Sequence, residues 1–415
     1  MLSEMVAPRA ARRASWVGNF LAILVCQFFV FATFSSAFPF LPLYLRELGE
    51  DEAGAVAWTG LAQSVGSAVL LVATPLWGAL ADRVGRKPMV VRSLVGGATS
   101  LGLMGLATQA WHLLVLRGLQ GATAGTNSAV IALAASVLPT ARLGLGLGLL
   151  QTAQFLGSSF GPLLGGATSA ALGFRGSFAI AGASLLAIAG LVTLLVREPA
   201  AQVARSVPMA SLRKRLATVA RAPRLRAPIL AILGFQAAYA VSITLLPLHV
   251  YSLTSGGVDA PTAVGAALAA GALGVATGAA VLGWLGGRVG ARTVALLSLA
   301  GSALLSLPQA WLAHPLQFVP LRLALGFCAG GVLPSLRATL GEEASADRVM
   351  GANLGAVYGL AQSAFAGGMM LGPPLSSLVA TLWGLPAIHV ASAALLLATA
   401  AWWRAQSAGP AEHAG

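Results

Sequence analysis

Charge is unusual within the long apolar stretches of this sequence, and the ionisable side chains found there include Arg117, His249 and Arg322. An ionisable group in apolar surroundings is energetically costly, so each is a candidate for binding or coupling. A histidine can gain or lose a proton near neutral pH. Other roles stay open, because Arg117 can extend its charge toward a surface along its apolar stem and His249 can cap the end of a helix.

Patterns typical of catalysis are missing from the sequence. The two cysteines, Cys26 and Cys328, lie inside apolar stretches and have neither disulfide nor metal-site spacing. There is no phosphate-binding loop for ATP. The five histidines stand singly, with no acidic partner nearby in the sequence: His112, His249, His314, His389 and His413. We therefore expect no catalytic residues, no metal and no cofactor. The alternative, a polytopic membrane acyl or glycosyl transferase, would need clustered His, Asp or Glu.

The composition indicates a membrane protein. Of the 415 residues, 57% are hydrophobic and 9% are charged, whereas soluble domains carry about 25% charged residues. All twelve Asp and Glu residues fall in gaps between apolar stretches or at a terminus, as the cost of a carboxylate in lipid requires. The net charge of +13 comes mainly from basic residues in the same gaps. They form no stripe with interleaved aromatics, so we expect no nucleic-acid partner.

Apolar runs long enough to cross a bilayer, about 20 residues each, predict an all-α protein with twelve transmembrane helices. Such continuous runs exclude the alternating pattern of a membrane barrel. The first run lacks a small-residue cleavage site and is expected to be a span, not a cleaved signal peptide. The expected spans are 16–45, 56–81, 89–109, 111–137, 143–171, 174–196, 227–253, 261–286, 291–312, 315–340, 349–380 and 384–403.

The basic residues predict the orientation and the domain boundaries. Most of the 25 Lys and Arg residues lie in gaps on one side, while Arg46 and Arg175 lie on the other. By the positive-inside rule, the rich side is cytoplasmic, so both termini are expected inside a bacterial-type inner membrane. The polar stretch 197–226 is the only long gap, and it is either an amphipathic surface helix or a solvated tether. It separates two expected six-helix bundles, 1–196 and 227–415.

The two halves repeat each other. An offset of 205 relates Gly78 to Gly283, and it also relates Arg117 to Arg322 and Gly121 to Gly326. Near the ends of the halves, Gly161-Pro162 corresponds to Gly372-Pro373, an offset of 211 and thus a drift of six residues. Internal repeats that enclose a central binding site are typical of secondary transporters.

The segment from Gly78 to Lys87 resembles the Gly-x-x-x-Asp-Arg-x-Gly-Arg-Lys signature of the major facilitator superfamily, and the resemblance covers nearly the whole chain. It implies a fold of two pseudo-symmetric six-helix halves. It also implies that Asp82 pairs with nearby arginines and faces the N-terminal end of span 11 near Val349, which closes the inner side of the outward-open state. The alternative is that the cations only set orientation. The expected gating residues are Gly78, Asp82, Arg83, Gly85, Arg86 and Lys87.

Two further segments strengthen the resemblance. Arg117 to Gly121 is similar to the superfamily's span-4 motif Arg-x-x-x-Gly. Residues 157–166 resemble the span-5 signature Gly-x-x-x-Gly-Pro-x-x-Gly-Gly of drug:proton antiporters. Its Gly157, Gly161 and Gly165 leave one helix face bare for a neighbour, and Pro162 can kink the helix, so this segment is a candidate hinge. Ordinary small-residue packing is the alternative interpretation.

The resemblance also selects candidates for the substrate cavity, because spans 1, 4, 7 and 10 line it in this fold and spans 2, 5, 8 and 11 lie at the interface. Uncharged polar groups beside aromatic rings suit amphipathic substrates, although packing explains any single aromatic equally well. The candidates are Gln27, Phe31, Phe34, Asn127, Gln151, Gln154, Phe155, Gln236, Tyr239, Phe327, Asn353, Tyr358 and Gln362.

The sequence departs from many drug:proton antiporters because no span carries a carboxylate at mid-depth. Arg117, Arg322 and His249 remain as coupling candidates, with Glu342 and Glu343 nearer the cytoplasmic mouth. The two arginines favour neutral or anionic amphiphiles. We expect a monomeric multidrug efflux antiporter that works by alternating access, contacts membrane lipid and uses a proton gradient. The alternatives are a lipid or lysophospholipid flippase, a facilitator, or an importer of the same fold.

Overall fold

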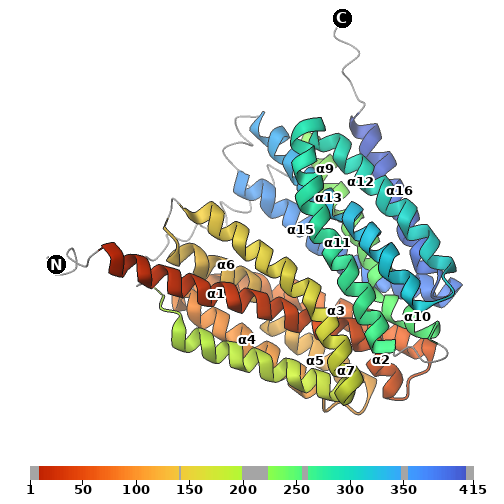
Figure 1. The fold of residues 1–415 in the computed structure, drawn as a ribbon, viewed down its shortest axis with the longest axis horizontal. Helices are drawn as coiled ribbons and strands as arrows, with labels where there is room; N and C mark the ends of the chain where they lie inside the picture. Colours follow the sequence, from red (N-terminus) through yellow and green to blue (C-terminus); the bar gives the residue numbers. More distant parts are fainter. Residues whose placement is uncertain (1–8, 140–141, 199–222, 255–259, 347–353, 408–415) are drawn as a thin grey trace, which may run out of the picture. The chain divides into compact units, whose positions relative to one another are not determined.

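The computed structural model describes residues 9–139, 142–198, 223–254, 260–346 and 354–407. Within these ranges the regular structure is entirely helical (Figure 1). Eight helical stretches of the described residues are long and apolar enough to cross a membrane. One of them, Gly146–Leu195, contains two of the predicted spans. The remaining predicted spans fall on α3 and α4 and on the pair α5 and α6, which are too short to qualify singly.

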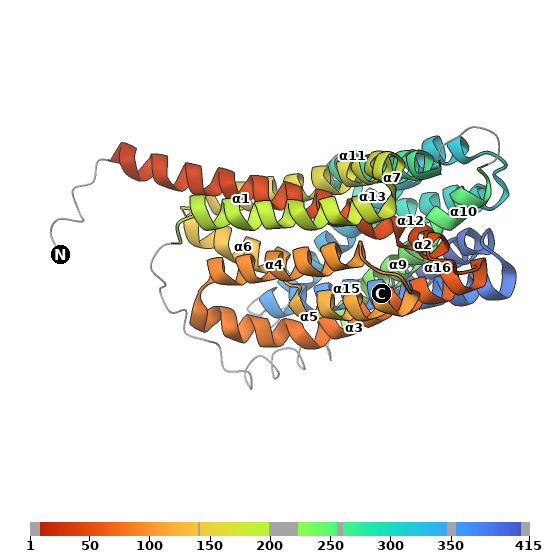
Figure 2. The same cartoon turned by 90° about the horizontal axis from the view of Figure 1, so that it is seen from below.

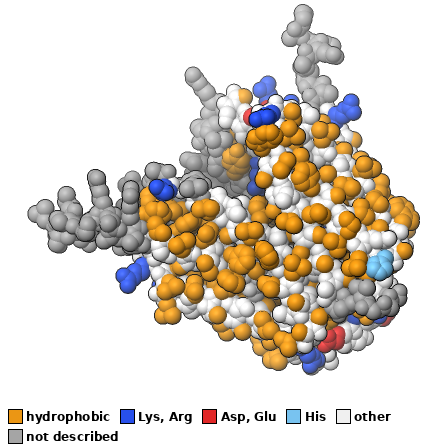
Figure 3. Space-filling model, in the orientation of Figure 1, with side chains coloured by type: hydrophobic (Ala, Val, Ile, Leu, Met, Phe, Trp, Pro, Cys, Tyr) orange, Lys and Arg blue, Asp and Glu red, His pale blue; other side chains and the backbone are white. Residues whose placement is uncertain are grey.

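The chain divides into two compact units, Met1–Phe38 with Val65–Ser206, and Pro39–Ser64 with Val207–Gly415. Most of the predicted linker, 197–226, lies outside the described residues, so the boundaries expected from the sequence stay a prediction. Large apolar side chains remain exposed in both units, Leu106 and Trp311 among them. Hydrophobic side chains dominate the face in Figure 3, which suits contact with lipid.

The first unit is built around a long bent helix. Helix α7 carries helical backbone angles except at Gly173 (φ 72°, ψ 173°), where two helical segments meet. Helices α1 and α4 pack along α7, and α1 lies beside it in both views (Figures 1 and 2). The helices of this unit are α1 (Arg9–Ala37), part of α3 (Glu52–Val84), α4 (Arg86–Met104), α5 (Ala110–Thr123), α6 (Thr126–Val137) and α7 (Leu143–Leu195).

Predicted span 4 is broken into α5 and α6, a difference from the continuous helix expected. The interruption lies at Ala124 and Gly125, and Gly125 has a left-handed backbone (φ 116°). Two side chains bind the carbonyl groups near the break: Trp77 Nε1 donates to Ala122 O (2.6 Å) and Arg92 Nη2 donates to Ala124 O (3.1 Å). The Arg92 guanidinium also stacks 3.6 Å from the centre of the Trp77 ring. A break within a span is tolerated where neighbouring side chains satisfy the backbone in this way.

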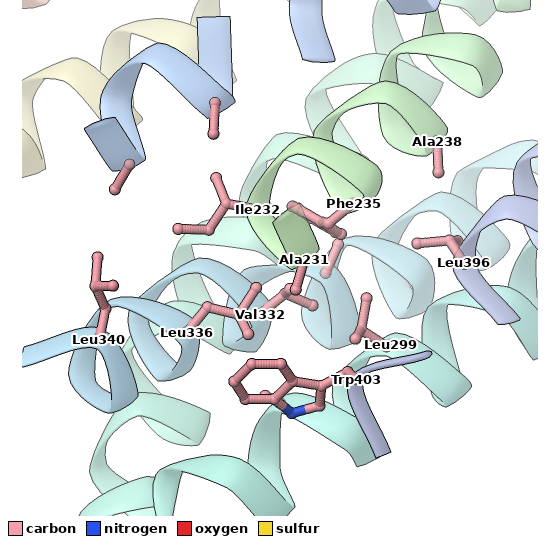
Figure 4. Packing of buried hydrophobic residues seen from close by; sticks show 14 of the residues in the cluster. Ala231, Ile232, Phe235, Ala238, Leu299, Val332, Leu336, Leu340, Leu396 and Trp403 are labelled. Carbon is pink, nitrogen blue, oxygen red and sulfur yellow. The ribbon is translucent and has the colours of Figure 1, made fainter. Parts of the chain in front are cut away.

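The second unit has an apolar core between α9, α12, α13, α15 and α16. In Figure 4, Trp403 of α16 lies near Leu299 and Val332, and the side chains of Ile232 and Phe235 complete the packing from α9. The elements of this unit are the start of α3, α2 (Leu41–Glu47), α9 (Pro223–Thr244), α10 (Leu246–Ser252), α11 (Ala260–Val289), α12 (Ala291–Ser306), η4 (Leu307–Trp311), η5 (Pro315–Gln317), α13 (Phe318–Ser345), α15 (Leu354–Trp383) and α16 (Ala387–Ser407). A short 3-10 turn, η2 (Phe38–Phe40), precedes α2.

The predicted repeat is visible in the packing of each unit. A Cβ atom added at Gly121 would collide with the carbonyl oxygen of Gly66, so α5 and α3 touch through their backbones. Likewise, a Cβ atom at Gly326 would collide with the carbonyl oxygen of Gly271 between α13 and α11. Both residues of the first pair map onto the second by the same offset of 205 (66 to 271 and 121 to 326). Close backbone approach through glycine is a common way for membrane helices to pack.

Candidate functional site

Two of the predicted coupling residues, Arg322 and His249, belong to one buried polar cluster in the second unit. Arg322 Nη2 of α13 donates to both the carbonyl oxygen (3.1 Å) and Oγ (3.0 Å) of Ser242 in α9. Ser242 Oγ lies 3.1 Å from His389 Nδ1 of α16, and His389 Nε2 lies 3.0 Å from His249 Nδ1 of α10. The chain of contacts therefore joins four helices through hydrogen bonds.

This cluster is closed to solvent and lacks an acidic member. The exposed fractions are 2% for Arg322, 2% for His249 and 0% for His389. The ring of Phe318 lies edge-on to His249, with centroids 5.3 Å apart. Among the described residues, the one ion pair joins Arg292 to Glu343, away from these groups. The guanidinium thus donates to neutral groups in the described hydrogen bonds, and its Nε has no hydrogen-bond partner among the described residues, an expensive arrangement in a dry interior.

Arg117, the repeat counterpart of Arg322, has different surroundings in the first unit. Its Nη1 donates to Oε1 of Gln120, one turn further along α5. Its guanidinium also stacks on the ring of Phe38, 4.2 Å from the ring centre. A cation above an aromatic face is stabilised by the ring quadrupole. Arg117 therefore has no histidine among these contacts, and it is half-buried.

The predicted gating loop has an acidic partner that the sequence analysis did not single out. Gly85 (φ 102°) makes the turn into α4, a conformation that glycine adopts without strain. The carboxylate of Glu198 then accepts hydrogen bonds from the backbone N–H groups of Arg86 (2.8 Å) and Lys87 (2.9 Å). An anion is favourable at the N-terminus of a helix. The side chains of Gly78, Asp82 and Arg83 lie outside the described part of α3, as does Val349, so the pairing expected for Asp82 stays a prediction.

The span-5 signature forms a tight contact with α1. A Cβ atom added at Gly157 would meet the carbonyl oxygen of Phe28, and one at Gly161 would meet that of Ala32. Gly165 and Pro162 are buried in α7 as well. The one non-helical residue within α7 is Gly173, eleven positions beyond Pro162. The bare face therefore holds α1 close, and its role as a hinge stays a prediction.

The cavity candidates are brought together in part. Gln27 Nε2 donates to Asn127 Oδ1 (2.8 Å) at the start of α6, and Gln27 is buried. Gln236 is also buried and bonds the sulfur of Met369, whereas Gln362 accepts a long hydrogen bond from Arg337 (3.5 Å). Asn353 lies outside the described residues. Among the rest, Phe31, Phe34, Gln154, Phe155, Tyr239 and Phe327 are half-buried, and Gln151 and Tyr358 are exposed.

The family model described as the Major Facilitator Superfamily matches residues 23–260 and 257–414. This chain belongs to that superfamily. It is a multi-pass membrane protein and a transporter, as the resemblance of its motifs implied.

Relatives over nearly the whole length support the same assignment. The chain is 33% identical to the multidrug resistance protein MdtG of Enterobacter lignolyticus over 392 residues, which cover 94% of this chain and 92% of the relative. It is 30% identical to an MdtG of Escherichia coli over 389 residues, 94% of each. The solved nucleoside transporter NupG superposes with a TM-score of 0.80 over 94% of this chain and all of that one, at 14% identity, a likeness of fold alone.

For this superfamily member, sequence reasoning found Arg322 and His249 but missed Ser242, His389 and Glu198. His389 satisfies the criterion that selected His249, an ionisable group in an apolar run, and applying it evenly would have included both. Ser242 carries no such mark, because a serine in a transmembrane helix is common. The two histidines are 140 residues apart in sequence, so only the fold reveals that they meet.

Proposed function

We propose that this transporter exports amphipathic small molecules across the inner membrane and that protons drive the export. The observation that carries the proposal is the similarity to multidrug resistance proteins over 94% of the chain. The glycine face of α7 packed on α1 supports it, because the sequence of that face resembles the antiporter signature. The transporter works by alternating access and functions as a monomer with both termini in the cytoplasm. It needs no cofactor and binds no nucleic acid.

The substrates we propose are neutral or anionic amphiphiles. Arg117 and Arg322 place positive charge inside the membrane-spanning part of each unit. The guanidinium of Arg322 donates to Ser242, and no ion pair of the described residues includes it. A site that offers cations and neutral polar groups attracts anions and repels lipophilic cations. Membrane lipid surrounds the exposed apolar side chains.

The test is substrate-triggered proton movement in proteoliposomes of the purified protein. A pH gradient is imposed, and an internal pH-sensitive dye follows its decay when neutral drugs, anionic amphiphiles, lipophilic cations or lysolipids are added. We expect neutral and anionic amphiphiles to dissipate the gradient, and an Asp82→Asn variant to be silent. If no compound moves protons while a fluorescent lipid still crosses the bilayer, the protein is a flippase or facilitator and the proposal is wrong.

A further inference from the structure

The hydrogen bonds of the buried cluster run in one direction. A guanidinium only donates, so Ser242 Oγ accepts from Arg322 Nη2. The hydroxyl hydrogen of Ser242 then points to His389 Nδ1. A neutral imidazole that accepts at Nδ1 carries its hydrogen on Nε2, which in His389 faces His249 Nδ1. The reverse arrangement would leave the hydrogen of Ser242 without an acceptor in any hydrogen bond of the described residues.

An additional proton changes this chain of hydrogen bonds at one place. When His389 gains a proton, both of its ring nitrogens become donors. Its Nδ1–H then points at Ser242 Oγ, which already accepts from Arg322. The hydrogen bond from Ser242 to His389 breaks, and an N–H bond to the incoming proton forms. The hydroxyl oxygen has two lone pairs and can accept from both groups, but the imidazolium and the guanidinium then meet at one atom, and their like charges repel strongly in a medium of low dielectric constant.

The residues of the cluster are buried and in contact with one another. Ser306 Oγ donates to His389 O (3.0 Å), and Phe318 lies against both imidazoles with ring centroids 5.3 and 5.8 Å away. A cavity of about 190 Å³ occurs elsewhere in this unit, lined by Gly283, Gly287 and Glu342 among others, and none of the cluster residues borders it. Because these groups are buried against one another and against Phe318, the ligand that suits this closed site is a proton.

Among the charged and titratable groups around the two histidines, Arg322 shares a hydrogen-bond partner, Ser242, with His389. Helix α9 contributes Tyr239 one turn from Ser242, and α13 contributes Arg322. Helix α2, which contacts α10, carries Arg46 and Glu47, and neither forms an ion pair with a histidine in the part of the chain that the structure describes. Helices α11 and α12 present no charged group to the pair in any described hydrogen bond or ion pair.

We propose that His249 and His389 together bind the driving proton, one proton per pair, and that this proton displaces Arg322 from Ser242. The proposal rests on the proton-driven export proposed above and names its proton site. Arg322 lies one turn from Phe318 on α13, and residues four apart share a helix face. Release of the guanidinium therefore changes the contacts of α13, the helix whose Phe318 packs against His249. When the proton leaves, Ser242 accepts from Arg322 again.

The experiment uses full-length protein in proteoliposomes with one substrate that the wild type moves. Two rates are measured: proton-driven accumulation under a pH gradient, and exchange of labelled for unlabelled substrate without a gradient. The variants are His249→Asn and His389→Asn, and the matched control is the exposed His314→Asn, which lies outside the cluster. We expect each cluster variant to lose about tenfold or more of the accumulation, the scale of coupling between two sites, with exchange retained. The control should match the wild type.

The outcomes separate the two proposals. If the wild type shows no proton-driven accumulation, the proposed function fails. If the wild type is driven and both cluster variants remain equally driven, the histidine site fails while the proposed function stands. A variant that also loses exchange is replaced by Ser242→Ala, which keeps both imidazoles and removes the contested oxygen. A changed pH profile of driven transport in Ser242→Ala supports the competition, and a profile that superimposes on the wild type overturns it.

Discussion

The two repeats hold an arginine at the same position but surround it differently. Arg117 and Arg322 are related by the offset of 205, and each lies beside a matching glycine contact, Gly66 with Gly121 and Gly271 with Gly326. The guanidinium of Arg117 contacts a glutamine and a phenylalanine. That of Arg322 begins a buried chain of a serine and two histidines.

The repeat shows which residues make the difference. The offset of 205 relates Ala37 to Ser242 and Tyr44 to His249. The later offset of 211, which also relates Gly173 (φ 72°) to Gly384 (φ 84°), relates Phe178 to His389. The first repeat therefore carries apolar or aromatic groups at the three places where the second carries Ser242, His249 and His389. Packing is common to both repeats, whereas the polar chain that suits proton binding belongs to the second alone.

The largest effect is expected from the arginines. Arg322→Met removes the buried charge and should abolish driven transport, while the thermal unfolding temperature in detergent stays the same or rises, because apolar replacement of a buried charge is often neutral or stabilising by about 1–4 kcal/mol. Arg117→Ala should also abolish transport with expression intact. Normal transport by Arg322→Met would contradict the role of Arg322 in driven transport. Misfolding of Arg322→Met while Arg117→Ala folds would show that Arg322 is needed for stability instead.

The shared packing is tested by Gly121→Val and Gly326→Val. Each places side-chain atoms where the backbone of the neighbouring helix lies, at Gly66 or Gly271. Overpacking of this kind costs about 1–3 kcal/mol or more, so both variants should unfold at clearly lower temperature and by similar amounts. Gly102→Val is the matched control, since a Cβ atom there meets nothing within 4 Å. A normal unfolding temperature in only one of the two variants would show that the repeats do not pack alike.

Arg322→Gln tests the electrostatic repulsion between Arg322 and the protonated histidine pair in the second repeat. Because a neighbouring positive charge repels a second one, its removal should move the pH of half-maximal proton binding by the purified protein upward, by about one unit if a coupling of about 1.4 kcal/mol is lost. Gln120→Ala, which removes the partner of Arg117 in the first repeat, should leave that pH unchanged. A pH profile that moves with Gln120→Ala instead would place the proton in the first repeat.

The smallest effect is expected at the gating loop. Glu198→Gln keeps the shape of the side chain but removes the negative charge that binds the N–H groups of Arg86 and Lys87. The substitution should lower the free energy of unfolding by about 0.5–2 kcal/mol, as for other helix N-terminal contacts. It should appear as a small drop in unfolding temperature relative to the wild type, and high salt should make this difference smaller. Glu47→Gln, on α2, is the control. An unchanged unfolding temperature would mean that the carboxylate contributes nothing to this turn.

Much of the fold is predictable from the sequence because membranes constrain it strongly. The apolar runs predict the spans, and the repeat predicts equivalent contacts such as those of Gly121 and Gly326. The interruption at Gly125 was not predicted, since apolar length alone does not reveal where a span breaks and Trp77 and Arg92 bind the freed carbonyls.

The candidate site is less predictable because its members meet only in three dimensions. Arg322 and His249 stood out as ionisable groups among apolar neighbours. Ser242 and His389 contact each other although they are 147 positions apart in the sequence. No sequence pattern reveals which distant residue a serine hydroxyl in a helix will bond. The repeat offers a signal in retrospect, because the positions where the two halves differ in polarity are the positions of the cluster.

The most direct test gives the second repeat the residues of the first. The triple variant Ser242→Ala, His249→Tyr and His389→Phe is reconstituted, and proton movement on substrate addition is compared with exchange of labelled substrate. We expect exchange to persist while substrate-triggered proton movement disappears. Proton movement at the wild-type rate in this variant would contradict the assignment of proton coupling to the second repeat.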